Sequence, residues 1–169
     1  MASFHLPVHV PPPLWALVAG LVQRRLPAGR PPGVLTKAAA GAVLVGSAAL
    51  VVTAGGRFRD AGTTVDPVHP ERVTHLVTDG PYALTRNPMY VSMAGVLVAH
   101  AVWRRSVAAL LPVAAFVAVI DRLQVPGEEA ALGDHFGSAY DDYRARVPRW
   151  VGLRPMSRPS REVTARRRP

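Results

Sequence analysis

The chain contains no cysteine among its 169 residues. Disulfide frameworks, thiolate metal sites and cysteine nucleophiles are therefore excluded. Charged residues are also few, at 18%, whereas about a quarter of an average soluble domain is charged. Aromatic residues make up only 7%, so the hydrophobic fraction of 49% comes mainly from Ala, Val and Leu. Acidic residues number 11 against 20 basic ones, of which 19 are Arg; this excess suits either nucleic acid or a membrane surface.

The apolar residues are concentrated in blocks that contain no Asp, Glu, Lys or Arg. The strongest candidate span has 19 residues, 38–56, and a helix needs roughly 20 residues to cross a hydrocarbon core of about 30 Å. Blocks of 17 residues (87–103) and 15 residues (106–120) follow, and together they predict a helical hairpin that crosses the membrane twice. A weaker fourth segment covers residues 12–22.

A soluble helical protein is the main alternative, because short apolar runs also occur in buried core helices. Such a protein needs helices with a polar outer face, whereas residues 38–56 offer only Ser47 and Thr53 as polar side chains. A cleaved signal peptide is disfavoured, since no Arg precedes the first apolar run and the prolines at 11–13 interrupt it. The expected fold is therefore all-α: a polytopic integral membrane protein with about four transmembrane helices.

Basic residues indicate the orientation, because they favour the cytoplasmic side of a membrane. Residues 55–86 contain four Arg, and nine more follow Arg122. Both segments are therefore expected to face the cytoplasm, in the inner (plasma) membrane of a bacterium, although four basic residues between positions 24 and 37 oppose this orientation. The Arg-rich end of the chain suits anionic lipid headgroups. Nucleic acid is not expected, because no aromatic residues are interleaved with these arginines.

The first candidate site group is polar and runs directly into the predicted span 87–103. It comprises residues 75–82 and 86–90, with one cation, two phenols and a histidine. Gly80-Pro81 indicates a turn, and Asn87-Pro88 is typical of the cap and first position of a helix. Singly, these residues fit a capped helix with aromatics at the membrane interface. Together, they suit a polar ligand that enters from the cytoplasm.

The second group follows the last predicted span. Glu128 and Glu129 stand at the start of an expected amphipathic helix, whose apolar residues are spaced by four, four, three and four positions: Leu132, Phe136, Tyr140, Tyr143 and Val147. This cytoplasmic tail helix would lie on the membrane surface and close over the opening of the hairpin. The two carboxylates fit the ordinary preference for negative charge at a helix N-terminus. Beside a membrane opening they also suit an ammonium, a ribose diol or a sulfonium.

Metal chemistry is not expected. Asp66, His69 and His75 are too irregularly spaced for a metal site. The chain also has no phosphate-binding glycine loop, serine elbow or HExxH motif.

The two groups together resemble the isoprenylcysteine carboxyl methyltransferase and phospholipid methyltransferase family of integral membrane enzymes. The resemblance covers roughly residues 73–152 and rests on Gly80-Pro81-Tyr82, Arg86-Asn87-Pro88-Met89-Tyr90, Glu128-Glu129, Phe136-Gly137 and Val147-Pro148-Arg149-Trp150. It implies methyl transfer from S-adenosylmethionine to a lipophilic acceptor, either a prenylcysteine-like carboxylate or a lipid amine. Residues 1–56 would then be N-terminal transmembrane segments, 57–152 the catalytic region of loop, hairpin and tail helix, and 153–169 a basic disordered tail.

The resemblance also implies where the cofactor binds. Its site would be lined by the residues that match the family's motifs: His75, Leu76, Val77, Gly80, Tyr82, Arg86, Asn87, Pro88, Tyr90, Glu128 and Glu129. Arg86 would recognise the cofactor's carboxylate or the acceptor, and the Glu pair would recognise its amino and ribose groups. Arg86, Asn87 and Glu129 are accordingly the expected catalytic residues.

Two positions depart from the family pattern. Asn87 stands at the middle position of a motif that is Arg-His-Pro in the carboxyl methyltransferases that the chain resembles. Unlike His, Asn cannot take up a proton at neutral pH. Transfer to a carboxylate mainly requires alignment and desolvation, whereas an amine acceptor needs a base elsewhere. The second departure is Val125-Pro126-Gly127, where the family usually continues its helix. A helix break there would displace the Glu pair relative to the span.

Two other functions compete with methyl transfer. Steroid-reductase-type membrane enzymes resemble the hairpin and tail helix but use NADPH, and no added basic cluster for a 2′-phosphate lies near this hairpin. A non-catalytic membrane adaptor with the same fold would tolerate replacement of Arg86 and the Glu pair. The acceptor and the oligomeric state stay open.

Overall fold

The structure is a computed structural model that describes residues 10–62 and 75–152. In this part of the chain the regular structure is all helical, which confirms the predicted all-α class. The elements are α1 (Pro12–Arg25), α2 (Val34–Asp60), a 3-10 turn at Gly80–Ala83, α3 (Pro88–Trp103), α4 (Leu110–Val119), α5 (Val125–Phe136) and α6 (Ser138–Arg146). The predicted tail, 153–169, lies outside the described residues, as do Asp66 and His69.

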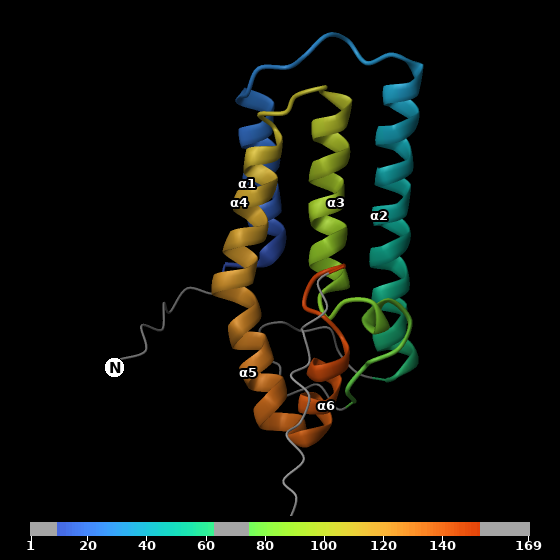
Figure 1. Cartoon of the computed structure of the whole chain (residues 1–169), viewed down its shortest axis with the longest axis vertical. Helices are drawn as coiled ribbons and strands as arrows, with labels where there is room; N and C mark the ends of the chain where they lie inside the picture. The colour runs from blue at the N-terminus through green and yellow to red at the C-terminus, as the bar shows by residue number, and fades with distance from the viewer. Residues whose placement is uncertain (1–9, 63–74, 153–169) are drawn as a thin grey trace, which may run out of the picture.

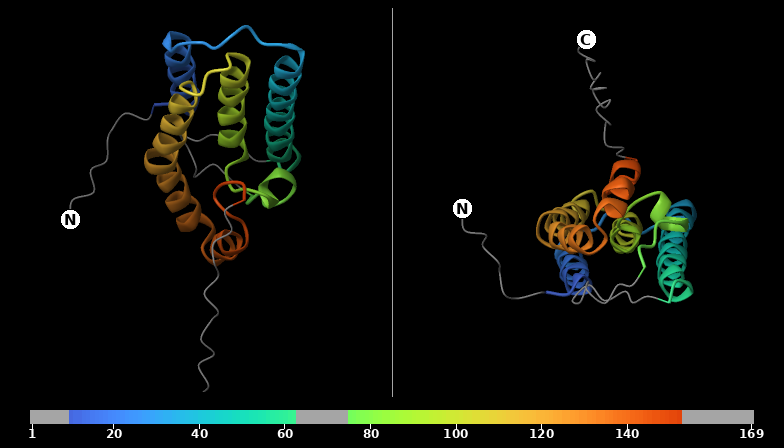
Figure 2. Two further views of the ribbon diagram at one scale, coloured as in Figure 1. Left: turned by 45° about the horizontal axis from the view of Figure 1, so that its top comes forward. Right: turned by 90° about the horizontal axis from the view of Figure 1, so that it is seen from below.

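Helices α1 to α4 lie side by side, and α3 contacts each of the other three (Figure 1). The predicted hairpin corresponds to α3 and α4. Helices α5 and α6 and the 3-10 turn lie together at one end of the bundle (Figure 2). Within the described ranges, two helices are long and apolar enough to cross a membrane, Val34–Asp60 and the continuous helix Leu110–Phe136, and Pro88–Trp103 is a shorter apolar helix.

Small residues allow α2 and α3 to approach closely. Gly95 on α3 faces Ser47 on α2, and a Cβ at position 95 would collide with the Ser47 hydroxyl oxygen. Ser47 Oγ donates to the carbonyl of Val43 in its own helix at 2.8 Å, so the hydroxyl is satisfied although it is buried. Contacts of this kind drive helix association where the surroundings are as apolar as the side chains.

Helices α4 and α5 form one continuous helix, so the break considered at residues 125–127 does not occur. A π-helical turn, Ile120–Gln124, joins them, and the backbone N–H of Val125 donates to the carbonyl of Ile120. Pro126 follows at once; it has no N–H to donate to the carbonyl four residues before it. The wide turn accommodates this loss without ending the helix. Glu128 and Glu129 consequently lie within a helix that continues the span, not at the start of a separate one.

The expected tail helix from Glu128 to Val147 is wrong as a single element, because it is divided at Gly137. This residue has φ +54°, a left-handed conformation that favours glycine and ends the helix. The chain turns there, and α6 packs Tyr140 and Tyr143 against Val77 and Tyr82 in an apolar cluster. The apolar residues of the predicted face are thus used, but they lie on two helices.

At the other end of the bundle, the side chain of Gln23 joins α1 to the α3–α4 hairpin through hydrogen bonds. Its side chain is fully buried, and Nε2 donates to the carbonyls of Leu97 at 3.0 Å and Ala109 at 2.8 Å. Its Oε1 lies 2.8 Å from Nδ1 of His100. Arg104 adds a hydrogen bond from Nη2 to the carbonyl of Leu26 at 2.6 Å.

Candidate active site

The candidate site lies where the start of α3 meets the end of the described chain. Segment 85–87 and segment 147–150 are joined through hydrogen bonds that involve the backbone. The N–H of Arg86 donates to the carbonyl of Pro148 at 2.9 Å. The carbonyl of Arg149 accepts from Thr85 Oγ1 at 2.7 Å and from Asn87 Nδ2 at 3.2 Å. Because these groups are paired, the approach to α3 has a fixed position relative to segment 147–150.

Arg86 and Glu129 form a buried ion pair at this junction. Arg86 Nη2 donates to Glu129 Oε1 at 2.6 Å, and the two side chains are only 8% and 12% exposed. Arg86 Nη1 donates to the carbonyl of Val147 at 2.6 Å and, more weakly, to that of Arg144 at 3.3 Å. These carbonyls lie at the C-terminal end of α6, where a cation also interacts favourably with the helix dipole.

Arg149 is a second cation on the same carboxylate. Its Nε and Nη2 donate to the two oxygens of Glu129 at 3.0 and 2.7 Å, and its Nη1 donates to Asp121 at 3.0 Å. Trp150 Nε1 donates to the same Asp121 oxygen at 2.8 Å. One bidentate guanidinium therefore ties α5 to the π-helical turn.

These partners determine the protonation states. Glu129 lies nine residues beyond Ile120, past the uncharged stretch of its helix. Burial by itself would raise the pKa of Glu129, but the hydrogen bonds from Arg149 and Arg86 outweigh it and hold the pKa below its ordinary value. The hydrogen bonds to Glu129 raise the pKa of Arg149, against the opposing effect of burial. Glu129 and Arg149 are thus both charged at neutral pH.

Glu128 points to different partners from its neighbour. Its Oε1 accepts from the Tyr90 hydroxyl at 2.5 Å and from Gln124 Nε2 at 2.8 Å. The contact with Tyr90 joins α5 to α3, and Gln124 belongs to the π-helical turn. Adjacent carboxylates on one helix thus contact different side chains: Glu129 lies between two guanidinium groups, and Glu128 accepts hydrogen bonds from Tyr90 and Gln124.

Five of the residues expected from sequence are brought together: Arg86, Asn87, Tyr90, Glu128 and Glu129. Pro88 begins α3 beside them. Val77, Leu76 and Tyr82 instead belong to the apolar cluster that holds α6. Tyr82 packs edge-on against Phe58 of α2 with ring centroids 5.3 Å apart, and its carbonyl accepts from the Tyr143 hydroxyl at 2.8 Å.

Gly80 and His75 lie at the margin. Gly80 has φ +56°, and a Cβ there would lie 2.8 Å from Nε of Arg57 on α2. Arg57 pairs with Asp79 at 3.3 Å in an exposed contact, which carries little energy. His75 is exposed. These residues precede α3 in the chain, in the turn Gly80–Ala83 or before it.

Sequence reasoning assigned no role to four residues that complete the site: Asp121, Gln124, Arg149 and Trp150. The motif Pro148-Arg149-Trp150 is part of the family pattern, so its position gave a signal, and Asp121 is the first charge after the span. Neither observation indicates which side chain these residues contact. The contact of Arg149 with Glu129 depends on the turn at Gly137, which was not predicted from the sequence.

The side chains of the site fit S-adenosylmethionine by their chemistry. That cofactor carries a carboxylate, an ammonium, a ribose diol and a sulfonium, and the site presents two guanidinium groups, two Glu carboxylates, a phenol and amides. Arg86 also has a buried Nε with no hydrogen-bond partner among the described residues, so its capacity to donate is not exhausted. Within residues 10–62 and 75–152, no group of three or more His, Asp or Glu can hold a metal ion.

The fold and site define a helical membrane protein with a charged centre at one end of its apolar hairpin. Comparison with known proteins identifies it further: the phospholipid methyltransferase family matches residues 35–139, and the chain belongs to that family. It is therefore an S-adenosylmethionine-dependent methyltransferase of a membrane, and its family implies a lipid acceptor. The sequence-based recognition, enzyme class and cofactor are confirmed.

Two other comparisons add little about the reaction. An uncharacterized protein of Haemophilus influenzae is 36% identical over 63 residues, which are 37% of this chain and 100% of that protein. No solved structure matches the chain.

Proposed function

We propose that the chain transfers the methyl group of S-adenosylmethionine to the polar head of a lipophilic acceptor at the cytoplasmic membrane interface. The observation that carries this proposal is the buried Arg86–Glu129 pair, with Glu128 beside it, at the end of the α3–α4 hairpin. A charged centre at the end of an apolar hairpin suits a polar cofactor from the aqueous side and a lipophilic acceptor from the apolar side. We also propose that the chain crosses the membrane four times, through α1 to α4. In this arrangement residues 1–56 are N-terminal transmembrane segments, residues 57–152 the catalytic region and residues 153–169 a basic tail.

The distribution of arginines supports the proposed cytoplasmic orientation of the site. Helix α6 carries Arg144 and Arg146, and segment 147–150 carries Arg149, beside the site. Basic residues near the ends of spans favour the cytoplasmic side.

We assign the residues of the site to different parts of the cofactor. Arg86 and Asn87 would bind and orient the cofactor's carboxylate, since a guanidinium and an amide both donate hydrogen bonds. Glu128 would bind its ammonium or ribose, and His75 and Gly80 would line the margin. When bound, S-adenosylmethionine supplies an electrophilic methyl group on a positively charged sulfur.

The chain's contribution to the displacement is alignment and the exclusion of water. Methyl transfer would form a bond between the acceptor's oxygen or nitrogen and the methyl carbon and break the carbon–sulfur bond, whose electron pair would stay on sulfur. A carboxylate acceptor needs no base. An amine acceptor must lose a proton, and Glu128 is the better proton acceptor, because Glu129 is held ionised between two guanidinium groups. Family membership favours this reaction over the reductase and adaptor alternatives.

Calorimetric binding of S-adenosylhomocysteine to the purified protein in detergent tests the cofactor site. Glu128→Gln keeps the size of the side chain and removes its charge, so we expect affinity to fall about tenfold or more. Asp142→Asn, at an exposed carboxylate of α6, is the matched control and should bind like the wild type. Glu129→Ala is a poorer choice, because it leaves Arg86 buried without its partner. Equal affinity of Glu128→Gln and wild type would remove Glu128 from the site.

A transfer assay completes the test. Radiolabelled S-adenosylmethionine is incubated with the protein and bacterial lipid extract, and we expect label in the lipid fraction. Acid-stable and base-labile label distinguishes an ester from a methylated amine. Absence of labelled lipid from a sample that binds S-adenosylhomocysteine would contradict the proposed acceptor class.

A further inference from the structure

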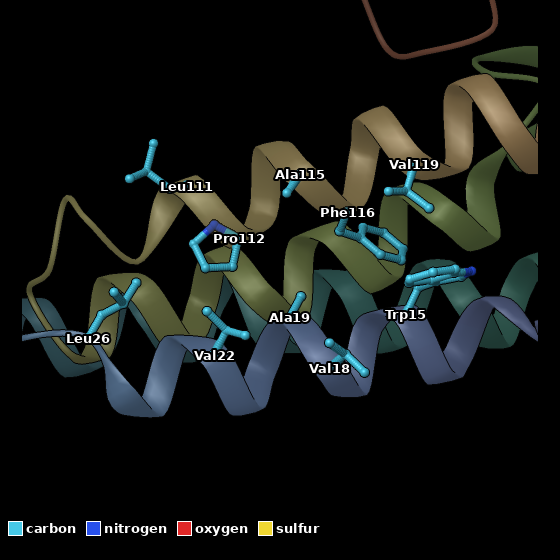
Figure 3. Close-up of a pocket in the computed structure, with 10 residues that line it drawn as sticks. All are labelled: Trp15, Val18, Ala19, Val22, Leu26, Leu111, Pro112, Ala115, Phe116 and Val119. Carbon is cyan, nitrogen blue, oxygen red and sulfur yellow. The ribbon is translucent and has the colours of Figure 1, made fainter.

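An apolar groove runs between α1 and α4, on the side of the bundle away from α2 (Figure 3). Its volume is about 460 Å³, and no charged residue lines it. Trp15 and Val119 lie at one end, and Leu26 and Leu111 lie at the other (Figure 3). The groove therefore follows the helix axes instead of crossing them.

The length of the groove matches one leaflet of a bilayer. Trp15 and Leu26 are eleven positions apart on and just after α1, which at 1.5 Å per helical residue corresponds to about 17 Å. Leu111 and Val119 are eight positions apart on α4, or about 12 Å. Half of a hydrocarbon core of about 30 Å is about 15 Å. An extended alkyl chain of a lipid fits this length.

The cross-section of the groove suits a single chain. Ala19 and Phe116 are buried at its floor, at 7% and 3% exposure, whereas Val18 and Leu111 on its walls are open. Small side chains, Ala19 and Ala115, create the hollow between larger neighbours. A concave apolar surface makes more van der Waals contacts with a chain than a flat helix face does.

The end of the groove at Trp15 and Val119 leads to the charged site. Trp15 and Trp150 both pack against the core cluster that contains Phe116 and Ile120, and Trp150 donates to Asp121, which pairs with Arg149. At the opposite end of the groove, Arg104 donates a hydrogen bond to the carbonyl of Leu26 and so joins the end of α3 to the end of α1. A chain lying in the groove would therefore place its polar head toward Arg149, Asp121 and the carboxylates of α5.

We propose that this groove binds one hydrocarbon chain of the methyl acceptor, so that the acceptor is a lipid whose long chain lies between α1 and α4 during the reaction. This inference rests on the proposed function and specifies its substrate. The groove selects the acceptor by its chain, and the charged site acts on its head.

The test uses a probe lipid: phosphatidylethanolamine with a diazirine at the end of one acyl chain, incorporated in nanodiscs with the full-length protein. After irradiation, mass spectrometry locates the labelled residues. We expect labelling concentrated on the groove residues of α1 and α4, and competition by unlabelled phosphatidylethanolamine. Labelling spread evenly over α2 and α4 would indicate bulk lipid contact only and would overturn the proposal.

A matched pair of variants separates the groove from general lipid contact. Ala115 lines the groove and Ala114 does not, yet both are exposed alanines of α4. Ala115→Trp should lower groove labelling about tenfold and raise the KM for long-chain acceptor lipid by a similar factor, while short-chain acceptors are unaffected. Ala114→Trp should behave like the wild type. Equal effects of the two variants would overturn the groove assignment.

Binding of S-adenosylhomocysteine distinguishes the two levels of failure. Both tryptophan variants should bind it with wild-type affinity, since neither residue belongs to the charged site. If the wild type does not bind it, the proposed function fails, whereas the labelling pattern still decides whether a lipid chain occupies the groove. If it binds normally but Ala115→Trp changes neither labelling nor KM, the groove inference alone is wrong.

Discussion

Arg149 donates hydrogen bonds to both carboxylate oxygens of Glu129, although the two residues lie 20 positions apart in the chain. The carbonyl of the same Arg149 accepts hydrogen bonds from Thr85 and Asn87. Through its side chain and its backbone, one residue thus joins α5 to the segment that begins α3. The geometry of the candidate site depends on this double connection.

Replacement of Arg149 tests that connection. Arg149→Gln leaves Glu129 with Arg86 as its remaining guanidinium partner and removes the bond to Asp121. Because Arg149 is 31% exposed, we expect a loss of about 1–2 kcal/mol in stability, less than the roughly 3–5 kcal/mol for breaking a fully buried pair. Thermal unfolding in detergent measures it, with exposed Arg146→Gln as control. Equal unfolding temperatures for the two variants would contradict the structural role of Arg149.

The lowered pKa of Glu129 predicts how stability depends on pH. Its pKa in the folded protein lies below the ordinary value of 4.5, so the folded state binds the proton less readily than the unfolded state does. The stabilisation is therefore present above about pH 4.5 and is lost as the pH falls through the folded pKa. Wild-type stability should decline more steeply below pH 4.5 than that of Glu129→Gln, measured by denaturation over a pH series. Parallel pH curves would refute this linkage.

The close contact of α2 and α3 predicts a size limit at Gly95. Gly95→Ala introduces a Cβ that collides with Ser47, and overpacking of this kind costs about 1–3 kcal/mol. Gly46→Ala is the control, because a Cβ at Gly46 meets nothing within 4 Å and helix propensity favours Ala. The double variant Gly95→Ala with Ser47→Gly should regain part of the loss. No rescue in thermal unfolding would mean that the Gly95 effect has another cause.

The buried amide of Gln23 predicts that α1 is fixed to the hairpin by hydrogen bonds. Gln23→Leu keeps the size of the side chain but leaves the carbonyls of Leu97 and Ala109 without this donor. We expect a loss of about 1–3 kcal/mol in stability, because two buried hydrogen bonds and the contact of Gln23 with Nδ1 of His100 are lost. Limited proteolysis between α1 and α2 should be faster in this variant. Thr53→Ala, at an exposed hydroxyl bonded within α2, should leave both readouts unchanged.

The sequence was sufficient to predict the helical class, the hairpin and the residues at its charged end. Long uncharged blocks have few structural solutions in a membrane, so the positions of α2, α3 and α4 follow from where charges are missing. Asn87-Pro88 likewise marks the start of α3, since proline at the first helical position is tolerated. These signals are local, and local signals can be read from a single sequence.

The connections between distant segments were not predictable in the same way. The spacing of Leu132, Phe136 and Tyr140 fits one helix face, but the left-handed conformation of Gly137 divides that face between two helices. The partner of Glu129 depends on the turn at Gly137 and not on any spacing. Pro126 suggested a break, whereas a π-helical turn absorbs its missing donor.

That π-helical turn has a consequence for the register of the last helix. A π turn is a local widening of an α-helix that accommodates one extra residue, and each residue of a regular helix turns the chain by about 100°. Deleting a single residue within Ile120–Gln124 would therefore convert the wide turn into a regular one and leave the phase of α5 relative to α4 almost unchanged. Glu129 would still face Arg86 after that deletion, whereas a deletion within the regular helix before Ile120 would turn both carboxylates of α5 by about 100° away from their partners.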